Sequence, residues 1–148
     1  MRDAELQAAL VIAIGERDMS ADTPATSAMR DARTAAERAR RLLRSRGYYA
    51  ARVDPFVDER QGASLRVLPG QQFTIRQVDA DAAGDTAARS HALEAVALTP
   101  GAPLLAQPVI DAEARALRTL HNEGWPDAEL LERDVIVDHA GQDGLITF

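Results

Sequence analysis

The spacing of hydrophobic and polar residues predicts two helices and then a β-hairpin in the first half of the chain. Apolar residues recur at intervals of three and four over residues 3–16 and again over residues 26–46, which is typical of helices with one buried face. The pattern then alternates, which predicts strands at residues 48–57 and 64–68 joined by a turn at Gln61-Gly62. Gly47 stands where the second helix has to end, because glycine readily adopts the left-handed backbone of a helix C-terminus.

The second half of the chain predicts one strand, two helices and two further strands. The expected elements are a strand at 72–79, helices at 89–98 and 108–123, and strands at 128–138 and 145–148. Gly124 ends the second of these helices, as Gly47 ends its counterpart. The element order is therefore β-α-α-β-β in the second half and α-α-β-β in the first.

A repeat relates the two halves. Residues 39–53 and 116–130 both run from an amphipathic helix into a glycine, an aromatic residue and an apolar/polar alternation, and the two glycines are 77 positions apart. Such self-similarity is the signature of a duplicated module. The sequence predicts an α+β fold of two tandem domains, residues 1–69 and 70–148. Each would be a three-stranded mixed sheet covered by two antiparallel helices. The first domain would lack its opening strand and the second would have a truncated last strand, so we expect a piece of a longer string of repeats.

Composition narrows the class of protein. The net charge is −6 and all 17 basic residues are arginine, so a general nucleic-acid binder is not expected. The chain has no cysteine, which excludes disulfides, thiolate metal sites and a cysteine nucleophile. No apolar run approaches the length of a membrane span, and the N-terminus lacks the apolar core of a signal peptide. These observations leave a cytosolic protein and an excised part of a larger one as alternatives.

Nothing in the sequence predicts catalysis, a cofactor or a metal. Asp79 and Asp81 are spaced like the first ligands of a calcium loop, but Ala83 and Ser90 stand where further oxygen ligands are required. His91, His121 and His139 are isolated from one another and from any metal-ligand spacing. No Gly-x-Ser-x-Gly segment marks a nucleophile, so we expect no enzyme activity.

One segment is strongly basic, although the chain as a whole is acidic. Residues 30–46 hold seven arginines against Asp31 and Glu37. The plain interpretation is a solvated helix face. Docking to an acidic neighbour or to anionic lipid head groups remains an alternative, whereas the lack of interleaved aromatic residues disfavours nucleic acid.

The order of these motifs resembles a known family of repeats. Gly47-Tyr48-Tyr49 after a helix, then Pro69-Gly70 before an alternating strand, is similar to the polypeptide-transport-associated (POTRA) repeat, as is Gly124-Trp125 in the second half. The nearest likeness is to the TamA-like, BamA-related outer-membrane assembly proteins. The second copy departs from the pattern at Pro126, which removes a strand hydrogen-bond donor. We interpret the shared residues as helix stops and packing anchors: Gly47, Tyr48, Tyr49, Pro69, Gly70, Gly124 and Trp125.

The resemblance implies a non-enzymatic interaction module. It would be the periplasmic portion of an outer-membrane protein, attached through a C-terminal barrel absent from this chain. Its partners would be unfolded outer-membrane proteins and TamB-like assembly subunits, with no nucleic acid.

An open sheet edge offers a mechanism for such binding. Pro55 cannot donate to a ladder, so the strand at 48–57 is expected at a sheet edge. An open edge can bind an extended segment through its backbone. The candidate residues are Ala51, Arg52, Val53, Asp54, Val57, Glu129, Leu131 and Val135.

Other functions remain open. The charges Arg52, Asp54, Asp58 and Glu59 would guard the edge against aggregation, and the edge would then bind nothing. The repeats could equally be rigid spacers of a two-partner secretion transporter. A third alternative is a cytosolic α+β regulatory domain or small enzyme.

Overall fold

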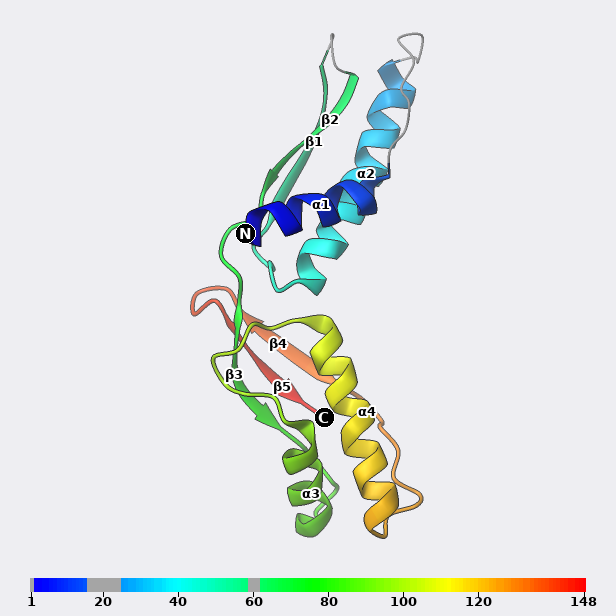
Figure 1. Ribbon diagram of the computed structural model, residues 1–148, viewed down its shortest axis with the longest axis vertical. Helices are drawn as coiled ribbons and strands as arrows, with labels where there is room; N and C mark the ends of the chain where they lie inside the picture. The colour runs from blue at the N-terminus through cyan, green and yellow to red at the C-terminus, as the bar shows by residue number, and fades with distance from the viewer. Residues whose placement is uncertain (1, 16–24, 59–61) are drawn as a thin grey trace. The chain divides into compact units, whose positions relative to one another are not determined.

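The computed structural model describes residues 2–15, 25–58 and 62–148, and it divides the chain into two compact units, residues 1–70 and 71–148 (Figure 1). Unit 1 contains the helices α1 (Arg2–Ile14) and α2 (Ala25–Ser45) and the strands β1 (Arg52–Asp58) and β2 (Gly62–Leu68). Unit 2 contains β3 (Thr74–Asp79), α3 (Thr86–Val96), α4 (Ala106–Glu123), β4 (Asp134–Asp138) and β5 (Asp143–Thr147).

Unit 1 is a pair of helices packed on an antiparallel hairpin. β1 and β2 pair from Arg52 opposite Leu68 to Asp58 opposite Gly62. The buried face of α2 is mostly alanine, and small side chains allow neighbouring elements to approach closely. The core consists of Leu6 and Leu10 from α1, Ala36, Ala39 and Leu43 from α2, and Val53 from β1.

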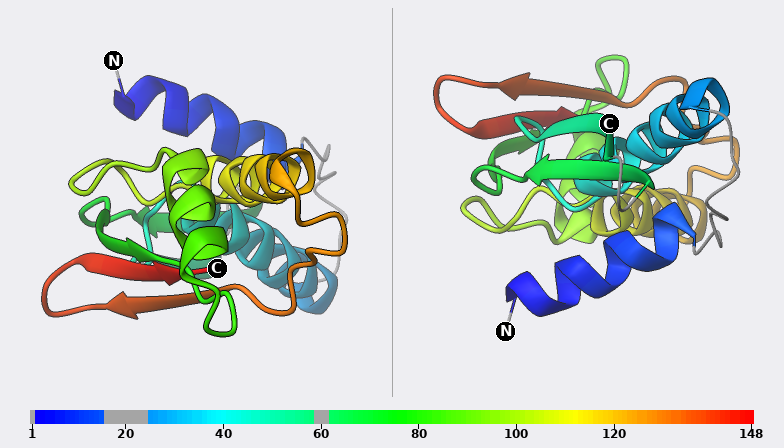
Figure 2. Two further views of the ribbon diagram at one scale, coloured as in Figure 1. Left: turned by 90° about the horizontal axis from the view of Figure 1, so that it is seen from below. Right: turned by 90° about the horizontal axis from the view of Figure 1, so that it is seen from above.

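Unit 2 is a three-stranded mixed sheet with two helices on one side, as the left view of Figure 2 shows. The strand order is β3-β5-β4, with β3 parallel and β4 antiparallel to the central β5. Larger side chains fill this core. Phe73 and Ile146 are fully buried, and Leu104 is 1% exposed. The alanines Ala92, Ala112 and Ala116 bring α3 and α4 into contact. The predicted α+β order, α-α-β-β and then β-α-α-β-β, is confirmed.

The backbone repeats itself at the predicted offset of 77 residues. The Tyr48 amide donates to the Leu43 carbonyl at 2.8 Å, and the Trp125 amide donates to the Leu120 carbonyl at 3.0 Å. A second pair follows, from Ala51 to Tyr48 at 3.3 Å and from Ala128 to Trp125 at 3.1 Å. Gly47 and Gly124 both have left-handed backbones, with φ of 84° and 116°. The two glycines therefore end equivalent helices, as predicted.

Several predicted boundaries need correction. The strand expected at 128–138 is wrong for its first six residues, because β4 begins at Asp134. The physical reason is that β5 supplies only five partners, the last being Thr147 opposite Asp134. The strand expected at 48–57 begins at Arg52, after a turn at residues 48–51. Glu16, Glu59 and Gln61 lie outside the described residues.

Candidate functional site

The outer edge of β1 is the first candidate site. In the described part of the chain β1 pairs with β2 alone, so its other edge has no neighbouring strand. Pro55 lies within it, opposite Leu65, which agrees with the rule that proline occupies edge strands. Of the candidate residues, Arg52, Asp54 and Val57 are exposed, Ala51 lies half-buried just before the strand, and the side chain of Val53 is in the core.

An arginine of α2 already forms a hydrogen bond with one backbone carbonyl of β1. The guanidinium of Arg40 donates a hydrogen bond to the carbonyl oxygen of Val53. An added strand therefore begins beyond Val53 or displaces Arg40, which leaves Asp54–Val57 as the free segment of β1. Sequence reasoning did not single out Arg40, because a contact over 13 positions between a helix and a strand leaves no local pattern.

The solvent face of the hairpin carries exposed apolar side chains as well as charged ones. Phe56 on β1 is 38% exposed, and the guanidinium of Arg66 on β2 lies 5.7 Å from the centre of its ring. Leu68 on β2 is 55% exposed. A strand added to β1 would place its side chains next to Phe56 and two strands away from Leu68.

The second candidate site is the outer edge of β4. Within residues 71–148, β4 pairs with β5 alone, and Val135 is half-buried in it. Glu129 and Leu131, expected in the same strand, instead lie in the irregular segment that precedes it. Leu131 is 88% exposed and Ile136, on β4, is 54% exposed.

Two side-chain contacts tie that irregular segment to α4. Arg133 forms an ion pair with Glu113, and the ring of His121 hydrogen-bonds to the Ala128 carbonyl at 2.7 Å. These contacts hold the segment as it approaches the short edge formed by β4.

The aromatic residues of the repeated motif act in packing and in capping. Tyr48 contacts the core of unit 1. Burial raises the pKa of Tyr49, and the nearby Arg44 acts in the opposite direction. Trp125 donates a hydrogen bond from its indole nitrogen to Asp85 at 2.9 Å. The Pro69-Gly70 pair of the motif lies between β2 and β3, and Gly70 has a left-handed backbone.

Asp85 caps the N-terminus of α3. Its Oδ1 accepts hydrogen bonds from the amides of Ala87 and Ala88, both at 3.0 Å. The bond from Ala88, followed by those from Trp125 and Ala87, lowers the pKa of Asp85. The prediction from sequence began this helix at Arg89 and missed the cap, although aspartate before a helix is a recognised signal.

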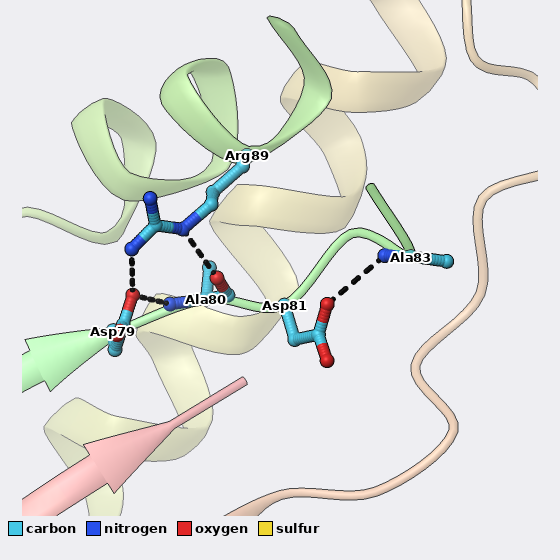
Figure 3. Close-up of polar contacts among 5 residues, drawn as sticks. All are labelled: Asp79, Ala80, Asp81, Ala83 and Arg89. Carbon is cyan, nitrogen blue, oxygen red and sulfur yellow. Dashed lines mark hydrogen bonds and ion pairs between the residues drawn. The ribbon is translucent and has the colours of Figure 1, made fainter. Parts of the chain in front are cut away.

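The two aspartates that suggested a calcium loop face different partners (Figure 3). Asp79 accepts from the Arg89 guanidinium at 2.6 Å and from the Ala80 amide at 2.8 Å. Asp81 accepts from the Ala83 amide at 3.0 Å. The hydrogen bond from Arg89 is the main cause that lowers the pKa of Asp79. Both carboxylates thus fix the loop between β3 and α3.

The other residues that could have formed a catalytic or metal site do not cluster in the described part of the chain. Across residues 2–15, 25–58 and 62–148 no cluster of three or more histidine, aspartate or glutamate side chains could hold a metal ion. His91 pairs with Glu123, and the His139 ring lies edge-on to Phe73 at 5.5 Å. Arg41 on α2 pairs with Glu37 at 3.9 Å, with both side chains exposed. Among the described helices none combines the length and the apolar character needed to cross a membrane.

The comparison with solved structures identifies a shared fold. The chain is similar to BamA from Haemophilus ducreyi lacking POTRA domains 1–3, with a TM-score of 0.55 and 21% identity over 98% of this chain and 26% of that one. It is also similar to POTRA3–5 of Haemophilus influenzae BamA, at TM-score 0.45 and 19% identity, over 78% of this chain and 47% of that one. For POTRA1–3 of the periplasmic domain of Omp85 from Anabaena the values are 0.42 and 18%, over 80% and 49%.

The first of these likenesses shows the fold, and it agrees with the predicted POTRA-like α+β class. The chain spans about a quarter of the length of that BamA. No family model and no curated protein matches the sequence.

Proposed function

We propose that this chain is a non-enzymatic interaction module, a tandem pair of POTRA-like units from the periplasmic part of an outer-membrane assembly factor. It binds extended segments of unfolded outer-membrane proteins by adding them to the outer edge of β1. The observation that carries this proposal is the open edge itself, since β1 contains Pro55 and pairs with β2 alone among the described residues.

Backbone complementarity suits a partner of variable sequence. An edge strand offers amide and carbonyl groups that any extended chain can use, so hydrogen bonds supply affinity with little sequence selection. The free segment Asp54–Val57 adds two exposed apolar side chains, Phe56 and Val57. We also propose docking of a TamB-like assembly subunit, for which the shorter edge of β4 is the second available surface.

A spacer function is the second candidate, and a specific observation favours it. Arg40 donates a hydrogen bond to the Val53 carbonyl, and Pro55 in the same strand has no amide hydrogen to donate. Both features protect the edge in the way that soluble proteins avoid edge-to-edge association. On this alternative the units hold other domains apart and bind no client.

Peptide titration distinguishes the two functions. Peptides with the alternating apolar and polar pattern of barrel strands, added to ¹⁵N-labelled protein, are expected to shift the amide signals of Asp54–Val57. A peptide N-methylated at every residue has no amide hydrogen on either edge, so it cannot complete the ladder and is expected not to bind. If no peptide binds, edge capture is wrong and the spacer alternative stands. If the N-methylated peptide binds equally well, the peptide binds without a backbone ladder, and both edge capture and the spacer alternative are wrong.

A matched pair of variants localises the binding. Phe56→Ser removes an apolar contact beside the added strand and is expected to weaken binding by up to about fivefold. Leu68→Ser removes an exposed apolar side chain from the same face, but on β2, and is expected to leave the affinity unchanged. Equal effects of the two substitutions would argue against docking at β1.

A further inference from the structure

Three arginines, Arg33, Arg40 and Arg44, lie on the side of α2 that borders the outer edge of β1. Arg40 reaches this edge and donates a hydrogen bond to the Val53 carbonyl. Arg33 precedes it by two helical turns and Arg44 follows it by one, so the three share one side of the helix. Arg44 also acts electrostatically on Tyr49, in the turn that leads into β1. All three side chains are exposed, and we call them the arginine flank.

The arginine flank runs along the free part of β1. The helix α2 and the strand β1 run in opposite directions, so residues earlier in α2 lie beside residues later in β1 (Figure 1). The two turns between Arg40 and Arg33 rise about 10 Å, which is the length of about three strand residues. Counted from Val53, Arg33 therefore lies alongside the free segment Asp54–Val57. A strand added there would lie beside the flank.

The acidic residues of α2 leave this flank positive. Glu37 pairs with Arg41 at 3.9 Å, and both of these side chains are exposed. Asp31 lies on the opposite side of the helix, where it lines a cavity beside β2 together with Arg38. The charges that border β1 are therefore mostly those of the three arginines.

The two faces of an added strand would meet different surroundings. Successive strand side chains point to opposite faces, and Val53 points into the core, so Asp54 and Phe56 project away from α2. Side chains on that face of the added strand would lie beside the ring of Phe56. Those on the other face would lie beside the arginine flank and Val57, which is 36% exposed.

We propose that the segment captured at β1 carries an acidic residue at every second position, facing the arginine flank, and apolar residues between them, facing Phe56. This inference rests on the proposed function, the addition of an extended segment to the edge of β1. A carboxylate is a stronger acceptor for the Arg40 guanidinium than a neutral carbonyl. It draws Arg40 away from the Val53 carbonyl, which then accepts a hydrogen bond from the added strand.

The probes are capped peptides in which valine alternates with glutamate, glutamine or lysine. The glutamate peptide is expected to bind about tenfold more tightly than the lysine peptide, with glutamine between them, and added salt should narrow the range. The net charge of the protein is −6, so an unlocalised attraction would favour lysine instead. If the three bind β1 equally, or lysine binds best, edge capture stands and the acidic preference is wrong. If none binds, both are wrong.

Two arginines of α2 provide matched variants. Arg33→Glu is expected to weaken binding of the glutamate peptide and to strengthen that of the lysine peptide, each by about fivefold. Arg38→Glu changes the net charge equally, but on the side of α2 that lines the cavity beside β2, and should change both affinities much less. Both side chains are exposed, so neither substitution disturbs the core. Equal effects of the two variants would contradict recognition by the flank.

Two further measurements test how the flank is used. The ¹³C carbonyl signal of Val53 should shift more with the glutamate peptide than with the glutamine peptide, because only a carboxylate competes for Arg40 with full charge. Equal shifts would show that Arg40 is not displaced by the acidic residue. Vesicles containing phosphatidylglycerol test a lipid surface as the partner. If they bind in a manner that Arg33→Glu abolishes, while the glutamate peptide shows no preference, the flank serves a membrane and the proposal is wrong.

Discussion

The repeated glycine–aromatic motif is used differently in its two copies. After Gly47 the half-buried Tyr48 packs against the core of unit 1, but after Gly124 the indole of Trp125 donates to Asp85, the cap of α3. His91 on α3 lies 5.4 Å from the Trp125 ring and pairs with Glu123 at the end of α4. In unit 2 the motif thus fastens the C-terminus of one helix to the N-terminus of the other.

Asp85 makes the stability of unit 2 depend on pH. Its hydrogen bonds lower its pKa from the ordinary value of 3.8, so the unfolded chain binds the proton more readily than the folded one. This stabilisation is present above that value and is lost as the pH falls through the lower folded pKa. Urea unfolding followed by Trp125 fluorescence from about pH 5 to about pH 2 should show the loss.

The Asp85→Asn variant retains a capping side chain, but this side chain does not titrate. The unfolding free energy of the variant should therefore fall less steeply than that of the parent as the pH is lowered over the same range. Some slope should remain, because the pKa values of Asp79 and Asp138 are also lowered, mainly by hydrogen bonds from Arg89 and from the Gly141 amide. Identical slopes for the variant and the parent would show that Asp85 does not carry the effect.

Ala97 ends α3 in a conformation that suits glycine better. Its φ is 51°, in the left-handed region that costs a residue with a Cβ about 1 kcal/mol or more. We expect Ala97→Gly to raise the free energy of unfolding by about 0.5 kcal/mol, after the greater freedom of glycine in the unfolded chain is subtracted. Ala87→Gly in the first turn of the same helix is the control. It has the same effect on the unfolded chain without the strain to relieve, and it should destabilise the protein in the same urea titration.

At the level of elements, α4 supplies the basic side chain that the last turn of α3 lacks. No basic residue lies in the last turn of α3, but Arg115 donates to the carbonyls of Ala95 at 3.3 Å and Val96 at 2.6 Å. Arg115→Met should lower the unfolding free energy of unit 2 by about 1.5 kcal/mol, because it removes charged hydrogen bonds to two helix-end carbonyls. Arg118→Met, an exposed position on the same helix, should have little effect in the same thermal or urea titration. A comparable loss in both variants would mean that the change is one of helix propensity alone.

Elements with local signals could be predicted from the sequence, and contacts between elements could not. The helix ends at Gly47 and Gly124 follow from glycine at the end of an apolar periodicity, and Pro55 correctly indicated an edge strand. The alternation at 128–133 failed as a strand signal because pairing requires a partner, and β5 offers none to those residues. In the candidate site, the contact of Arg40 with Val53 depends on how α2 packs on the hairpin.

For the molecule as a whole, the two cores differ in size. The largest fully buried side chains of the described residues are Phe73, Leu104, Val96 and Ile146 in unit 2, against Leu43 and Val53 in unit 1. Each such side chain contributes about 1.5–3 kcal/mol on burial. Unit 1 also has a sheet of only two strands among the described residues, and such a sheet is marginally stable. Unit 1 should therefore be the less stable of the two.

We expect the units to unfold in separate transitions, with unit 1 first. The single tryptophan, Trp125, reports on unit 2, whereas far-ultraviolet circular dichroism reports on both units. In urea the dichroism should begin to fall before the fluorescence changes, which is the sign of departure from two-state behaviour. A peptide that binds at the edge of β1 should shift only the first transition to higher urea, because a ligand stabilises the unit that binds it. Superimposed transitions that the peptide moves together would show instead that the two units unfold as one cooperative body.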